Sequence, residues 1–139
     1  MGIPHAVLDS AAYLHLSLFA RCVLVELVRA FRGFNNGKIA IGQRAIAERL
    51  GNSNFGKIGA AIAELMEHGL IDVTTEGQLR PRRARQYRLT FVSTGTFERP
   101  IPATNEYLSW KPDPPTADDV TTADGILALR PRQQKLKIC

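Results

Sequence analysis

The chain has 139 residues, of which 45% are hydrophobic and 22% charged, and its formal net charge is +5. This composition is typical of a soluble globular protein with one domain, and no apolar run approaches the roughly 18 residues that a membrane-spanning helix needs. Two cysteines make neither a disulfide framework nor a metal cluster, and the first ten residues do not resemble a secretory signal, so we expect a cytoplasmic protein.

Residues 1–16 read as an entry segment with a short helix that starts near Ser10. Ser17 is a good N-cap for a second helix, in which apolar side chains recur at helical spacing. The predicted buried positions are Leu18, Cys22, Val25, Leu27, Val28 and Phe31. Val23 and Leu24 widen the apolar surface beyond one stripe. This helix therefore either lies at the centre of the fold or contacts a second copy of the chain.

A turn, a strand and two helices are expected next. "GFNNG" (33–37) has the residues of a turn, and "KIAI" (38–41) alternates like a short strand. A short helix over 43–51 buries Ala45, Ile46, Ala47 and Leu50 and ends at Gly51. A longer helix begins at an N-cap, either Ser53 or Asn54, and runs to about His68. Its predicted inward positions are Ile58, Ala61, Ile62, Leu65 and Met66.

Two strands then flank a basic loop. The first strand spans 70–76, with Ile71 and Val73 facing inward, and the second spans 86–91. In the second strand, Tyr87, Leu89 and Phe91 are predicted to face inward, and Gln86, Arg88 and Thr90 outward.

The basic segment holds the whole excess of positive charge. Residues 1–76 carry seven basic and seven acidic side chains, and residues 93–139 carry six of each. Residues 77–92 carry no acidic side chain and five arginines: Arg80, Arg82, Arg83, Arg85 and Arg88. A local block of one sign indicates a polyanionic partner.

Beyond Ser93 the pattern weakens. Residues 93–110 are expected to form an extension with a short helix from about Thr104, in which Tyr107, Leu108 and Trp110 pack back on the domain. Residues 111–139 begin with a stretch rich in Pro, Thr and Asp. That stretch cannot bury enough apolar surface to offset its ordering entropy, so a flexible, disordered tail is expected.

The predicted fold is mainly α with a small antiparallel sheet (α+β). The order of elements, with "RAIAERLGNSN", "IGAAIAELMEHGLIDV" and "RQYRLTF", resembles the winged helix-turn-helix family of DNA-binding proteins over residues 17–92. Its wing corresponds to the basic loop. "PHAVLDSAAYLHLS" and "PATNEYLSW" resemble, more narrowly, small helix-turn-helix proteins of proteobacterial mobile elements.

The resemblance implies that the helix from about residue 53 to 68 enters the major groove of double-stranded DNA by its N-terminal end, as the size of a helix allows. The residues expected to contact bases are Ser53, Asn54, Lys57 and Ala60. Gln43 and Arg44 are expected on the flanking backbone. The arginines of the loop, with Arg88, are expected on the backbone or in the minor groove. The helix is poor in long polar side chains, so the loop has to supply much of the affinity.

We therefore expect a sequence-specific DNA-binding protein, a homodimer that regulates transcription and is nucleoid-associated when bound. One alternative is a replication or transfer factor of a mobile element that uses the same surface. Another is an interaction module whose basic loop binds an acidic protein. No catalytic motif, cofactor motif, small-molecule effector or metal-ligand spacing is evident, so an enzyme is not expected. Cys22 is assigned to the core.

Overall fold

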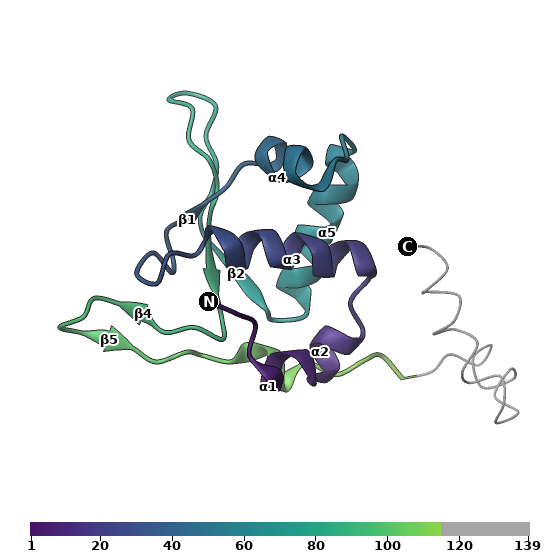
Figure 1. The fold of residues 1–139 in the computed structure, drawn as a ribbon, viewed down its shortest axis with the longest axis vertical. Coiled ribbons are helices and arrows are strands. Elements are labelled where there is room, and N and C mark those ends of the chain that lie inside the picture. Colours follow the sequence, from purple (N-terminus) through teal and green to yellow (C-terminus); the bar gives the residue numbers. More distant parts are fainter. Residues whose placement is uncertain (115–139) are drawn as a thin grey trace, which may run out of the picture.

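A computed structural model describes residues 1–114 of the chain as a mixed arrangement of helices and small antiparallel sheets (Figure 1). The helices are α1 (His5–Leu8), α2 (Ala11–Leu14), α3 (Leu18–Ala30), α4 (Gln43–Leu50) and α5 (Phe55–Glu67), with a 3-10 turn, η1, at Glu106–Ser109. The strands are β1 (Ile39–Ala40), β2 (Ile71–Thr75), β3 (Gln86–Leu89), β4 (Thr94–Gly95) and β5 (Pro100–Ile101). Residues 115–139, which include most of the expected tail, lie outside the described part.

The larger sheet has the order β1-β3-β2, and all of its pairs are antiparallel. Tyr87 pairs with Ile39 on one side and with Val73 on the other, and an irregularity between Val73 and Thr75 shifts the register of β2. The strands β2 and β3 form a hairpin whose connection is the basic loop. A second hairpin, β4–β5, extends away from the helices (Figure 1) and was not expected from the sequence.

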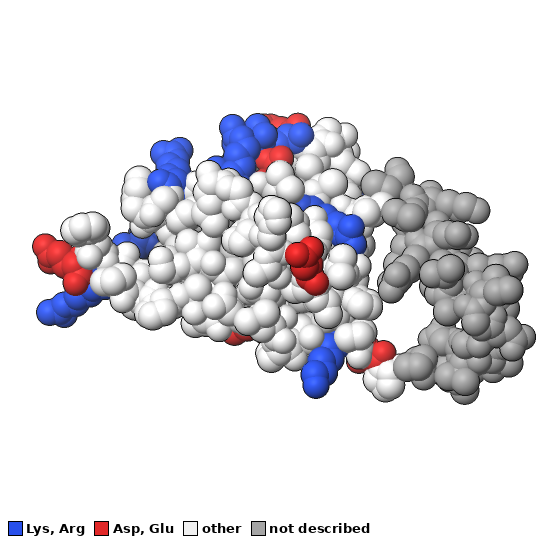
Figure 2. All heavy atoms as spheres, turned by 60° about the horizontal axis from the view of Figure 1, so that its bottom comes forward, with Lys and Arg blue, Asp and Glu red and all other residues white. Residues whose placement is uncertain are grey.

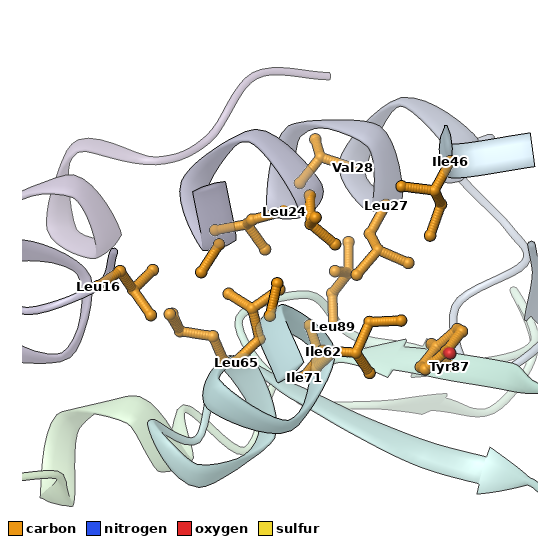
Figure 3. Close-up of a cluster of buried hydrophobic side chains, with 14 of the residues drawn as sticks. Leu16, Leu24, Leu27, Val28, Ile46, Ile62, Leu65, Ile71, Tyr87 and Leu89 are labelled. Carbon is orange, nitrogen blue, oxygen red and sulfur yellow. The ribbon is translucent and has the colours of Figure 1, made fainter. Parts of the chain in front are cut away.

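The helix α3 lies at the centre of the core, where it packs against α4, α5 and β1. Leu24 and Leu27 of this helix point toward α5 and the sheet (Figure 3). The core also contains Ile46 of α4, Leu65 of α5 and Tyr87 of β3. The central position that the sequence left as one of two alternatives is thus confirmed.

The buried face of α3 differs from the expected one. Leu27 and Val28 are buried as expected, but the face is completed by Ala20, Val23 and Leu24, and Cys22 and Val25 are exposed. The assignment of Cys22 to the core is therefore wrong. Both sides of this helix are apolar, so spacing alone could not select the inward side. The buried face of α3 also includes a charged residue, Glu26, because this carboxylate pairs with Arg49 of α4.

Three serine or asparagine side chains fix where the helices begin. The hydroxyls of Ser10 and Ser17 accept backbone hydrogen bonds at the starts of α2 and α3, as expected. The carboxylate of Glu64 accepts two further bonds from Ser17, one from its N–H and one from its hydroxyl, each 2.7 Å long. This contact joins the start of α3 to α5. For α5 the structure selects Asn54 over Ser53 as the N-cap.

Four other expected orientations are wrong. Ala45, Met66 and Leu108 are exposed rather than buried. Thr90 was expected to face outward but is fully buried, because β3 ends at Leu89 and strict alternation ends with it. The Thr90 hydroxyl donates to the carbonyl groups of Gly69 (2.6 Å) and Leu70 (3.1 Å), so its burial leaves no polar group unsatisfied.

The extension after Ser93 returns to the domain through aromatic contacts. Tyr107 is buried with its ring edge toward Phe91, and Trp110 stacks on His68 with 4.1 Å between ring centroids. Gly69 has a φ of +73°, and a Cβ there would lie 2.9 Å from the backbone of Glu106. A side chain at position 69 would therefore push the extension away. Within residues 1–114, no helix is long and apolar enough to cross a membrane.

Candidate nucleic-acid interface

The connection between α4 and α5 is short and tightly hydrogen-bonded. Gly51 ends α4 in the left-handed conformation (φ 63°), and the N–H of Asn52 donates to the carbonyl of Ala47. The Asn52 side chain then accepts from the N–H of Asn54 at 2.9 Å. These bonds fix the first turn of α5 relative to α4 and leave that turn exposed.

The residues expected to contact bases lie together at this end of α5, and all four are exposed. Two of them already have internal contacts. The Asn54 side-chain oxygen accepts from the N–H of Lys57 at 3.0 Å, which leaves its amide NH₂ free of that bond. The ammonium of Lys57 lies 4.7 Å from the ring centroid of Phe19, a cation–π contact with the start of α3. Ser53 and Ala60 are the other two.

Gln43 and Arg44 lie at the start of α4, beside α5. A Cβ built at Gly59 would lie 3.4 Å from the Gln43 side-chain nitrogen, so this glutamine covers the surface of α5 at Gly59. The Arg44 side chain is 79% exposed, and its contact with Glu48 is long, at 3.9 Å. Such an exposed pair contributes little to stability, which leaves Arg44 available for a ligand.

The basic loop is a folded extension of the β2–β3 hairpin. We call residues 76–85 the arginine loop. Gln78 and Arg83 pair through two backbone hydrogen bonds of 3.0 and 2.9 Å, which confine the tip to residues 79–82. Arg80, Arg82 and Arg83 are exposed, and none of them has an ion-pair partner among residues 1–114.

The other two arginines of the basic segment pair with carboxylates. Arg85 lies 2.9 Å from Glu76 across the base of the loop. It also lies beside the hydroxyl of Tyr87, where it partly opposes the rise in pKa that burial causes for that group. Arg88 is held by Glu106 (2.8 Å) and Asp72 (3.2 Å), and the hydrogen bond to Glu106 is the main cause of the raised pKa of Arg88.

Arg88 therefore has a structural position that the sequence did not indicate. Its side chain is only 16% exposed, and it joins β2 and β3 to the extension at η1. Of these five arginines, only Arg80, Arg82 and Arg83 have no ion-pair partner among residues 1–114. We accordingly leave Arg88 out of the candidate interface, and Arg85 belongs to its edge.

The arginine loop and the α4–α5 connection lie at the same edge of the molecule, at the top of Figure 1. The face that Figure 2 turns forward comes from the opposite edge, where α1 and α2 lie, and it carries few charged side chains. Exposed apolar residues of this region include Leu14 and Leu108. The two candidate DNA-contacting segments thus share an edge that differs from this weakly charged face.

This edge also exposes an aromatic residue, Phe55, that the sequence did not indicate as part of the site. Phe55, the first residue of α5, is 48% exposed although it is a large aromatic side chain. It borders an open hollow of about 320 Å³ between α4 and the connection, with Arg44 and Ser53 on the same rim. The sequence feature that could have indicated this exposure is the position of Phe55 immediately after the N-cap, because the first side chains of a helix lie at its open end.

Comparisons with known proteins identify no relative. No family model matches the chain, and no curated protein and no solved structure is detectably similar to it. Within the described residues, no group of three or more His, Cys, Asp or Glu side chains is placed to hold a metal ion. The candidate interface is therefore supported only by the geometry and charge of this chain.

Proposed function

We propose that this protein binds double-stranded DNA as a winged helix-turn-helix module. In this proposal α4 and α5 are the helix-turn-helix, α5 enters the major groove by its N-terminal end, and the arginine loop is the wing. The wing lies on the backbone or in the minor groove of the adjoining DNA. The role that we propose for this binding is regulation of transcription.

The observation that carries the proposal is the position of unpaired charge. Three exposed arginines at the arginine loop share one edge of the molecule with the exposed start of α5. The free N–H groups of a helix start favour a phosphate, and arginines without acidic neighbours favour a polyanion. The strand order β1-β3-β2, with α3, α4 and α5 before the hairpin, supports the same reading.

A second copy of the chain is part of the proposal. The outer side of α3 exposes Val25 and Cys22 next to an apolar pocket formed with Ile3 and Phe31. Apolar surface on a helix of this length favours contact with a partner copy. Two copies related by a two-fold axis would read a palindromic site with half-sites about one helical turn apart.

A gel-shift titration of a random duplex pool at two salt concentrations tests the function. We expect binding at low micromolar protein in low salt and marked weakening in higher salt, because released counterions drive the association. Binding of an acidic polypeptide such as polyglutamate, with no binding to duplex DNA, would instead favour the protein-interaction module.

A further inference from the structure

After its polar N-cap, α5 has a mainly apolar exposed surface in its first two turns. The first two turns expose Phe55, Gly56 and Ala60, together with Lys57. Lys57 is directed over the ring of Phe19 at 4.7 Å. Arginine and glutamine, the long side chains that pair with guanine or adenine through two hydrogen bonds, do not occur in these turns.

We propose that Phe55 is a specificity-determining residue that recognises the C5-methyl group of thymine. This inference rests on the proposed binding of DNA by α5. The thymine methyl is the one apolar group that base edges present in the major groove, and an aromatic or small apolar side chain is its chemical complement. Phe55 projects from the end of the helix that reaches the base edges first, and its 48% exposure leaves ring surface available.

The neighbours of Phe55 support close approach of that ring to a base edge. Gly56 has no side chain, and Ala60, about one turn further on, has only a methyl group. The ring borders the open hollow of about 320 Å³ whose rim also carries Arg44 and Ser53. A thymine methyl at this position would contact the ring while Arg44 remains beside the phosphate backbone. The three unpaired arginines of the arginine loop supply the charge complement that brings DNA to this edge.

Replacing thymine with uracil removes the methyl group and leaves every hydrogen-bonding group of the base unchanged. The probe is the duplex most enriched from a random pool by the full-length protein, with its thymines replaced by uracil one at a time. Binding is measured by fluorescence anisotropy. We expect at least one position at which uracil weakens binding by about fourfold, the value of one buried methyl-sized group.

Variants at position 55 assign this preference to the ring. Phe55→Ala should bind thymine and uracil at that position equally well, and Phe55→Leu should retain part of the preference because it keeps an apolar side chain. Phe34→Ala and Phe97→Ala remove other exposed phenylalanines and should leave the preference unchanged. The ratio of the two affinities within each variant is compared, so a general loss of affinity does not affect the conclusion. Circular dichroism checks that each variant is folded.

The outcomes separate this inference from the proposed function. Wild-type binding with no thymine preference at any position, or a preference that survives Phe55→Ala, overturns the inference and leaves DNA binding standing. Tighter binding of a single strand than of its duplex would also overturn it, because the ring would then stack on an unpaired base. Failure to bind any duplex overturns both.

Discussion

Removing the three unpaired arginines should change the salt dependence of DNA binding by a defined amount. Arg80, Arg82 and Arg83 are exposed and lie without an ion-pair partner among residues 1–114, so each can neutralise one phosphate. Each such contact contributes about 0.9 to the slope of log K against log salt, so the triple alanine variant should reduce the magnitude of that slope by about 2.7 per chain. Between roughly 50 and 200 mM salt this difference amounts to about 40-fold in Kd.

The assay is fluorescence anisotropy with one labelled duplex at four or more salt concentrations. A matched variant replaces Arg32, Arg99 and Lys111 with alanine, which changes the net charge equally but alters exposed basic residues of the turn after α3, the β4–β5 hairpin and the segment after η1. We expect this control to shift the slope much less, because these three residues lie outside the candidate interface. Equal changes in slope for the two triple variants would refute a localised interface and indicate binding through net charge alone.

Three further predictions concern residues outside that set. Asn36→Ala should lower the free energy of unfolding by about 2–4 kcal/mol in urea titrations, because the buried Asn36 side chain accepts from the N–H of Leu89 and donates to carbonyl groups at the end of β3. Phe34→Ala, at an exposed neighbour, should change the free energy of unfolding little. An equal loss in both variants would contradict a stabilising role for the Asn36 hydrogen bonds. Arg88→Gln should lower the free energy of unfolding by about 1 kcal/mol, because the two carboxylates that pair with Arg88 are about half exposed. The same variant should leave the salt dependence of DNA binding unchanged. A smaller salt dependence would show that Arg88 belongs to the interface. If the proposed dimer forms through the outer side of α3, Val25→Asp should convert it to a monomer in light scattering. Leu108→Asp, an equally polar change at another exposed apolar site, should leave the dimer intact. A dimer that persists with Val25→Asp would exclude the outer side of α3 as the interface.

Much of the chain's secondary structure was predictable because its boundaries are encoded locally. The structure agrees that Gly51 ends α4 and that Ser17 caps α3. Alternation located β3 correctly at Gln86, although the strand ends at Leu89, two residues earlier than expected. The β4–β5 hairpin was missed because its strands have two residues each, too few for alternation to be visible. Local signals therefore located the longer elements and failed where an element is very short.

Side-chain positions were harder to predict, because tertiary contacts decide them. Spacing could not choose between the two apolar sides of α3, and so Cys22 was placed inside. The charge count identified the basic segment but could not show that carboxylates outside it, on Glu76, Asp72 and Glu106, hold two of its five arginines. Those partners lie up to 18 residues away in sequence, so only the fold brings them together.

The residues of the candidate site also fall into a group that the sequence indicated and a group that only the structure reveals. The sequence identified the exposed residues of the α4–α5 connection and the arginine loop, because polar and basic side chains have a clear pattern. It did not identify Phe55, since an aromatic residue within a helix usually belongs to the core. It is exposed because it is the first residue of α5 and borders the open hollow beside α4.

The proposed function requires the start of α5 and the arginine loop to bind the same DNA molecule. Its most direct test is a backbone amide NMR titration of the full chain with a short random-sequence duplex in low salt. We expect shift changes at residues 43–44, 53–60 and 78–83, with the amides of α1, α2 and η1 little affected. Changes confined to α1, α2 and η1, or no changes at all at millimolar duplex, would contradict it.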